Sequence, residues 1–85
     1  MTRRDKDLRR ILDGRNDSNI DFDLLVTVLK RLGYEERTKG SHHAFRKEGV
    51  AERLTLASHT KLAEAYQVRQ VRRVILEYEL LEPDE

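Results

Sequence analysis

Between Ile20 and Gly33 the apolar residues recur every three or four positions, which is the spacing of one face of an α-helix. Asp21 is a favourable N-cap residue, and Ile20 before it can pack on the next turn as a hydrophobic staple. Gly33 stands where a helix-ending glycine is expected. These signals predict one helix, whose apolar face comprises Phe22, Leu25, Val26, Leu29 and Leu32.

After Gly33 the helical spacing gives way to short alternating segments. Residues 34–38, 42–46 and 50–57 each alternate between the two faces of a strand. Lys39-Gly40 separates the first two segments, and Lys47-Glu48-Gly49 separates the last two. Short strands joined by glycine-containing turns predict a three-stranded antiparallel meander.

The alternation also predicts which side chains share a face of this sheet. His43 and Phe45 point one way, whereas His42, Ala44 and Arg46 point the other way. An antiparallel sheet can be covered by helices on one face and stay open to solvent or a ligand on the other. We therefore expect His42 on the open face and His43 against the core.

Helical spacing returns at both ends of the chain. Residues 1–13 form a short basic amphipathic pattern that Gly14 ends, and a polar linker follows at 15–19. Residues 66–78 form a longer helical pattern after an irregular segment at 58–65. Two interpretations are open for the first helix: it docks its few leucines on the body of the protein, or it forms a basic arm that touches phosphates.

The order helix, helix, three strands, helix predicts an α+β domain with the helices on one face of a small antiparallel sheet. The expected core consists of Phe22, Leu25, Leu29, Phe45, Leu54, Leu56, Val71 and Ile75. The face of the last helix that is expected to meet solvent carries Gln67, Arg69, Gln70, Arg72 and Arg73. An acidic tail at residues 82–85, which includes Pro83, ends the chain.

Composition narrows the classes of function. The chain has 85 residues, of which 38% are hydrophobic and 39% charged, with a formal net charge of +1. One small domain is expected, and any contact with nucleic acid depends on local basic patches. The chain holds no cysteine, which excludes disulfides and thiolate zinc sites and favours a reducing, cytoplasmic setting. No apolar run approaches the ~18 residues of a membrane span.

The segment Gly40-Ser41-His42-His43 is the most informative one for function. Two of the three histidines of the chain stand here side by side, just after a glycine. Histidine exchanges protons near neutral pH, and a glycine lets another backbone or a phosphate approach closely. His42, on the expected open face, can reach a phosphate or be an ordinary exposed strand residue. His43 is expected to be structural or orienting.

Polar residues beside the histidine pair have both a functional and a plain interpretation. Ser41 can orient a phosphate or the neighbouring histidine, or it can serve only as a turn residue. Lys39 and Arg46 flank the pair, so they can bind phosphate or form a solvated strand edge.

Other candidates lie further along the chain. His59 can supply a second proton-transfer group if its loop folds back. Arg69, Arg72 and Arg73 have the helical spacing of a ridge that contacts an RNA backbone, and a solvated helix face is the alternative. No metal site and no cofactor are expected, because neighbouring strand residues point to opposite faces and no cysteine is present.

From Ile20 to Leu80 the chain resembles the HicA family of bacterial toxins, small ribonucleases of toxin–antitoxin pairs. The resemblance rests on four segments: the leucine-rich helix that ends in Leu32-Gly33-Tyr34, Gly40-Ser41-His42-His43-Ala44-Phe45, Leu54-Thr55-Leu56 leading to His59, and the closing helix Val68 to Ile75. It implies a fold similar to the double-stranded RNA-binding domain (dsRBD), metal-independent cleavage of messenger RNA, and a HicB-like antitoxin that covers the active face.

The resemblance also assigns roles within the glycine-serine-histidine segment. The family's catalytic histidine carries over to His42 and its supporting glycine to Gly40, with Ser41 and His43 beside them. The chain departs from the family pattern in two places. A basic segment at residues 1–19 precedes the HicA-like domain at 20–81. Ala57 or Ser58 stands where the family's usual proline ends the third strand.

The expected function is that of the toxin of a type II toxin–antitoxin pair, acting as a metal-independent endoribonuclease on mRNA in the cytoplasm. The residues expected to contact RNA are Lys39, Arg46, Arg69 and Arg73. The alternative is a non-catalytic RNA-binding module, or an inactive toxin relic, that uses the same surface.

Overall fold

The computed structural model describes the backbone of residues 3–81 and the side chains of residues 6–81. The expected acidic tail at 82–85 and the side chains of the first arginines lie outside this range. The elements in chain order are α1 (Arg3–Asp13), the 3₁₀ turn η1 (Asp17–Asn19), α2 (Phe22–Arg31), β1 (Glu35–Lys39), β2 (His42–Lys47), β3 (Val50–Ala57) and α3 (Ala65–Glu77). Each of the helices and strands begins and ends within two residues of the segment predicted for it.

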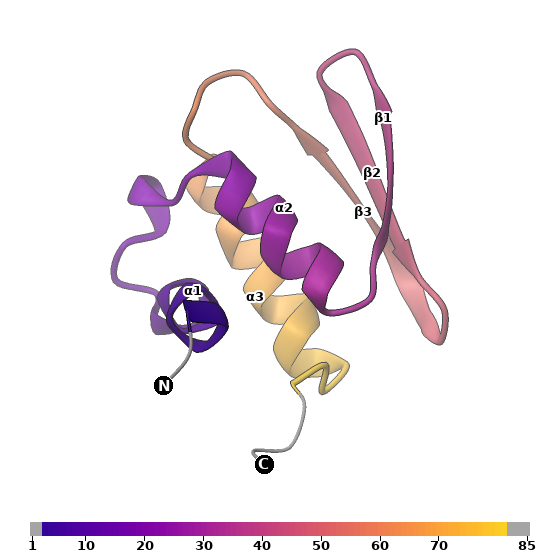
Figure 1. Ribbon diagram of the computed structural model, residues 1–85, viewed down its shortest axis with the longest axis horizontal. Helices are drawn as coiled ribbons and strands as arrows, with labels where there is room; N and C mark the ends of the chain where they lie inside the picture. The colour runs from indigo at the N-terminus through magenta and orange to yellow at the C-terminus, as the bar shows by residue number, and fades with distance from the viewer. Residues whose placement is uncertain (1–2, 82–85) are drawn as a thin grey trace.

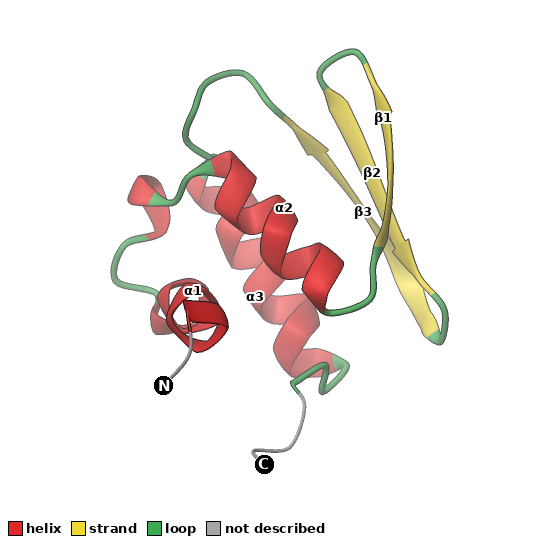
Figure 2. Cartoon of the chain, viewed as in Figure 1, coloured by secondary structure: helices red, strands yellow, loops and turns green. Residues whose placement is uncertain are grey.

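The strands form one antiparallel sheet in the order β1-β2-β3 (Figure 2). Lys39 pairs with His42 across the first hairpin, and Phe45 pairs with Leu54 across the second. The register of the second hairpin shifts just after Phe45, which marks a β-bulge. The α+β fold predicted from the sequence is confirmed, and this arrangement of helices and sheet is consistent with a dsRBD-like fold.

The elements stack in three layers (Figure 1). The sheet is one layer, α2 and α3 lie side by side against one of its faces, and α1 packs on the far side of this helix pair. No element in the described part of the chain covers the other face of the sheet. That uncovered face carries His42, Ala44 and Arg46, all exposed, so it is the open face that the alternation predicts.

Apolar side chains fill the space between the sheet and the helix pair and continue beneath α1. All eight residues predicted for the core are buried, and Ile11 and Ile20 join them with no exposed surface. Leu8 and Leu12 pack against the same core from α1. The first helix therefore docks on the body of the protein, on the side of the helix pair that faces away from the sheet.

One prediction for α3 is wrong: Gln67 is only 1% exposed instead of facing solvent. Its amide oxygen accepts a hydrogen bond from the backbone N–H of Glu64 at 3.0 Å. Its amide nitrogen donates to the backbone oxygen of Ala57, also at 3.0 Å. Because both ends of the amide are paired, its burial costs little. Gln67 thereby ties the start of α3 to the end of β3.

The two ends of α2 fix how the chain enters and leaves this helix. Asp21 stands at the N-cap as predicted, but its carboxylate makes no capping hydrogen bond. Gly33 has a φ of +101°, and its N–H donates to the oxygen of Lys30, while the N–H of Tyr34 donates to that of Leu29. This pair of bonds is a Schellman motif, which ends the helix and directs the chain into β1.

Candidate active site

A two-residue turn positions the candidate histidine. Gly40 and Ser41 connect the paired residues Lys39 and His42, and Gly40 has a φ of +60°. A glycine at the first position of a two-residue hairpin supplies the positive φ that a type II′ turn requires. Apart from Gly40 and its two chain neighbours, no heavy atom of the protein lies within 4 Å of the place where a Cβ on Gly40 would stand. The backbone of the turn is therefore accessible to a ligand.

His42 is the first residue of β2 and lies on the open face of the sheet. Its side chain is exposed, and it pairs through its backbone with Lys39 on one side and Ala57 on the other. No hydrogen bond to its imidazole is found among the described residues. Both ring nitrogens are thus free to meet a substrate.

His59 lies at the same end of the sheet as His42. The N–H of Ser58 donates to the backbone oxygen of Ser41 at 2.9 Å, which continues the β2–β3 pairing one residue beyond Ala57. The next residue, His59, therefore follows directly beside the β1–β2 turn, and its side chain is exposed. A proline at position 58 has no N–H and could not make this bond. Ser58, in place of the family's usual proline, therefore allows a backbone bond that a proline would not.

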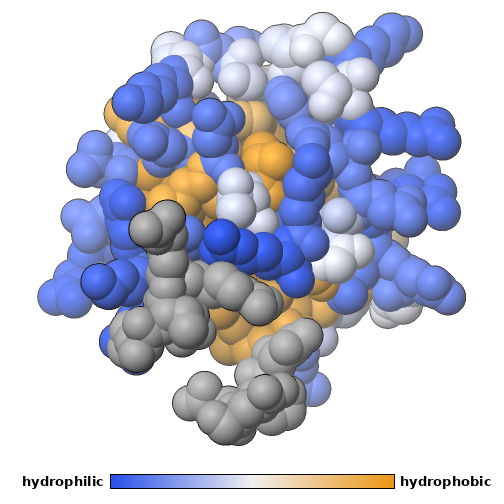
Figure 3. Space-filling model, viewed as in Figure 1, coloured by the Kyte–Doolittle hydropathy of each residue, from blue (hydrophilic) through white to orange (hydrophobic). Residues whose placement is uncertain are grey.

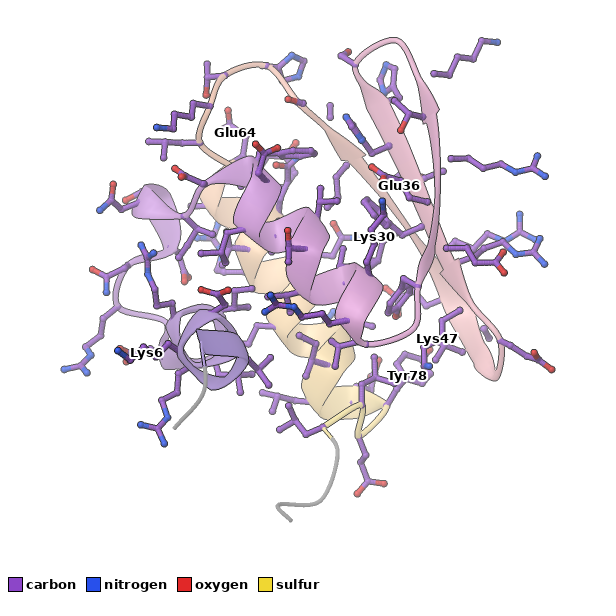
Figure 4. All side chains as sticks on the ribbon, in the orientation of Figure 1. Lys6, Lys30, Glu36, Lys47, Glu64 and Tyr78 are labelled. Atoms are coloured by element: carbon purple, nitrogen blue, oxygen red, sulfur yellow. The ribbon has the colours of Figure 1, made fainter. Side chains whose placement is uncertain are left out.

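His43 points to the opposite face and belongs to a polar cluster at the edge of the core, together with Lys30 and Glu36, which are labelled in Figure 4. Its Nδ1 lies 2.7 Å from a carboxylate oxygen of Glu36, and its ring packs on Phe22 with 4.9 Å between ring centroids. Lys30 on α2 contacts the other oxygen of Glu36 at 3.1 Å. The hydrogen bond with His43, and next the one with Lys30, lowers the pKa of Glu36 below its ordinary value. His43 therefore joins β1, β2 and α2 instead of facing a substrate.

The arginines of α3 lie on the helix layer, away from the open face of the sheet (Figure 1). Arg73 forms ion pairs with Glu52 on β3 and with Glu77 on its own helix, and Arg69 lies one turn before it on the helix layer. Neither residue is on the open face. Arg72 pairs with Asp17 of η1 and donates to the backbone oxygen of Ile11 in α1. That these arginines form a ridge that contacts RNA stays a prediction: Arg72 and Arg73 are paired with carboxylates of the chain, and Arg69 and Arg73 are exposed on the helix layer.

Four cations lie on the open face instead: Lys39 and Arg46, which the sequence predicted, and Arg37 and Arg53, which it missed. All four side chains are exposed, and none forms an ion pair with another described side chain. The alternation of strand side chains predicts both missed residues: Arg37 is two residues before Lys39 and so shares its face, and Arg53 is next to buried Leu54 and so points the other way. The surface on the sheet side of the molecule is accordingly hydrophilic, while apolar atoms show between the helices (Figure 3).

The arrangement supplies the groups needed for proton transfer at a phosphate. An accessible imidazole, an exposed turn backbone and a nearby ammonium gather at one end of an open sheet, with a second imidazole beside them. These groups can accept a proton, donate one and stabilise negative charge. Within residues 6–81, no three side chains of the kinds that bind metals are grouped closely enough to hold an ion.

Comparison with known proteins gives one informative match. A family model described as the HicA toxin of bacterial toxin–antitoxin systems matches residues 23–76, well over half of the chain. Searches of curated proteins and of solved structures give no significant match. No helix among the described residues has the length and apolar character needed to cross a membrane. The matched region contains nearly all of α2 and α3 and all three strands, including the histidine pair, and the chain therefore belongs to the HicA toxin family.

Proposed function

We propose that this toxin is a metal-independent endoribonuclease that cleaves mRNA, with His42 as its catalytic residue. The observation that carries the proposal is the position of His42: exposed, without a hydrogen-bond partner among the described residues, and next to a glycine turn on the open face. Lys39 pairs with His42 across the hairpin, which supports a role in binding the phosphate, and Ser41 in the turn can orient it.

The chemistry uses a nucleophile that RNA itself carries. A base removes the proton from the 2′-hydroxyl, and the 2′-oxygen attacks the adjacent phosphorus to form a new P–O bond. The bond from phosphorus to the 5′-oxygen breaks, and that oxygen takes up a proton. The products are a 2′,3′-cyclic phosphate and a 5′-hydroxyl. His42 performs one of the two proton transfers, and Lys39 offsets the negative charge that develops on the phosphate.

This mechanism makes a direct prediction about the substrate and about metals. We expect the purified protein to cleave single-stranded RNA in the presence of EDTA, to leave 2′,3′-cyclic phosphate ends, and to leave DNA of the same sequence intact. DNA resists because it lacks the 2′-hydroxyl. Gel analysis of labelled oligonucleotides, together with mass spectrometry of the ends, measures all three results.

Two outcomes would count against the proposal. Activity that is lost on chelation and restored by magnesium would show that the histidine site does not act alone. A protein that binds RNA without cleaving it would instead favour a non-catalytic RNA-binding module or an inactive relic with the same surface.

We also propose that an antitoxin of the HicB kind covers the open face. An enzyme that degrades mRNA harms its own cell, so a partner has to block the site. The face presents Arg37, Lys39 and Arg46 around His42, which a partner with acidic or polar groups complements. Such a partner competes with RNA for the same cations.

The partner proposal predicts charge-dependent binding. We expect the product of the neighbouring open reading frame to co-purify with this chain and to dissociate faster as salt rises, because charge-driven association is screened. Lys39→Glu should weaken the complex, whereas Lys6→Glu on α1, on the far side of the helix pair, should not. If nothing binds, and if the chain is harmless when expressed alone, the toxin–antitoxin interpretation fails for this protein.

A further inference from the structure

A second group of cations lies on the open face, at the end of the sheet away from the β1–β2 turn. Arg46 on β2 and Arg53 on β3 line a hollow of about 650 Å³. Glu35 and Glu48 also line it, and Ala51 leaves space between them because its side chain is small. Since Arg46 is four residues along β2 from His42, the hollow lies ~14 Å from the histidine at ~3.4 Å per residue.

The β-bulge accounts for the shape of this hollow. Phe45 pairs with Leu54 and Lys47 pairs with Val50, so three residues of β3, Ala51–Arg53, face Arg46 alone. Extra residues in one strand bend it and increase its twist, which opens the sheet surface at that point. Bulges recur beside binding sites because they redirect side chains.

An ion pair on the helix side of the sheet contacts the bulged segment. Glu52, in the middle of the bulged segment, points to the helix side, where Arg73 of α3 donates to both of its carboxylate oxygens. Successive residues of a strand point to opposite faces, so anchoring Glu52 on the helix side keeps Arg53 on the open side.

We propose that this hollow binds one nucleotide of a single-stranded RNA whose chain continues from His42, with Arg46 and Arg53 holding its phosphate. The proposal rests on the proposed function of His42. A guanidinium suits a phosphate because it offers several donors in one plane. A stacked strand advances ~3.4 Å per nucleotide, so a few nucleotides cover the distance between the two sites.

The acidic residues in the hollow favour a whole, unpaired nucleotide over a bare phosphate or a duplex. Carboxylates accept hydrogen bonds from the exocyclic amino groups of bases. Glu35 and Glu48 can do so while the arginines bind the phosphate. In single-stranded RNA the edges of the bases are free for such contacts, whereas in a duplex they are paired.

The binding test uses the His42→Ala protein, so that the RNA stays intact, and a fluorescein-labelled single-stranded RNA. Adding Arg46→Ala and Arg53→Ala should raise the Kd by ~10-fold or more, because each lost charged hydrogen bond contributes on that order. The slope of log Kd against log salt should fall by about 1. The matched control, Lys6→Ala with Arg9→Ala, removes the same charge from α1 and should change neither quantity appreciably.

The cleavage test uses the same arginine changes in protein that retains His42. The loss in kcat/KM should be several times larger for an oligonucleotide than for a dinucleotide that spans only the His42 site. Equal losses on both substrates, an unchanged Kd, or equal binding of duplex RNA would overturn the subsite. If the double arginine variant no longer binds the antitoxin but keeps its affinity for RNA, the subsite is also overturned, and the hollow belongs to the partner interface.

The two proposals fail in different ways. If the wild-type protein does not cleave RNA but the double arginine variant still loses affinity, the catalytic role of His42 is wrong and the nucleotide subsite stands. If cleavage is normal and affinity is independent of the two arginines, the subsite is wrong and the catalytic role stands.

Discussion

Replacing His42 with alanine is expected to lower the rate of RNA cleavage by about 10² to 10⁴, the contribution typical of a positioned acid or base. The free energy of unfolding should change by less than about 0.5 kcal/mol, because an exposed side chain without partners stabilises little. Single-turnover cleavage of a labelled RNA measures the first quantity, and urea denaturation measures the second. Expression of the variant should also be harmless to the cell.

His43→Ala is the matched control, since it removes an imidazole from the adjacent position on the other face. Its ring is 19% exposed, packs on Phe22 and contacts Glu36, so its loss should cost about 1 to 3 kcal/mol in stability. The folded fraction should still cleave RNA. The opposite pattern, with cleavage lost in His43→Ala and kept in His42→Ala, would show that the two faces have been assigned the wrong roles.

His59→Ala shows whether the second imidazole takes part. The backbone bond from Ser58 to Ser41 places His59 beside the turn, but its ring is free to adopt several orientations on the surface. A rate loss of ~10² together with the disappearance of one limb of the pH–rate profile would assign His59 the second proton transfer. If His59→Ala cleaves RNA at a rate close to that of the wild type, water or Lys39 performs the second proton transfer.

The distribution of side chains between the faces of the sheet could be predicted from the sequence because strand geometry alone determines it. Once Phe45 and Leu54 are assigned to the core, the two-residue period sends His42 and Arg46 to the open face. The same rule places Arg37 and Arg53 there, and it identifies them without any knowledge of the tertiary structure.

The contacts made by the polar residues of α3 could not be predicted in this way. A helical pattern shows which side chains face away from the core, but it does not show which residues those side chains contact. Gln67 donates a hydrogen bond to the end of β3, Arg72 forms an ion pair with Asp17, and Arg73 forms one with Glu52. The Arg72–Asp17 contact joins residues 55 positions apart, and it exists only because α1 docks on the outer side of the helix pair. Periodicity holds no information about contacts of that kind.

Arg72→Ala is expected to produce the largest loss of stability among the polar residues discussed. Its guanidinium makes two hydrogen bonds to the carboxylate of Asp17, at 2.8 and 3.0 Å, and a third to the backbone oxygen of Ile11 at 3.1 Å. The Arg72 and Asp17 side chains are only 20% and 12% exposed. Removing the arginine leaves both acceptors unpaired in a place that water reaches poorly, which should cost about 2 to 4 kcal/mol.

The matched control for this change is Arg15→Ala. Arg15 also makes two hydrogen bonds to an aspartate, Asp13, but its side chain is 83% exposed. Exposed pairs contribute little to stability, so the Tm should fall by ~10 °C or more for Arg72→Ala and by only a few degrees for Arg15→Ala. Equal shifts for the two variants would mean that burial does not strengthen the Arg72 pair. Thermal denaturation followed by circular dichroism decides between these results.

The pH dependence of the Arg72 effect gives a second measurement of the same pair. The hydrogen bond from Arg72 lowers the pKa of Asp17 below its ordinary value. A carboxyl group whose pKa is lower in the folded chain than in the unfolded chain stabilises the fold above the unfolded value, ~3.9 for aspartate. That contribution disappears as the pH falls through the lowered folded pKa. The stability difference between wild type and Arg72→Ala should therefore be largest near neutrality and shrink steadily below about pH 4. A difference that stays constant down to strongly acidic pH would mean that Arg72 acts through packing and through its bond to Ile11, and not through the charge of Asp17.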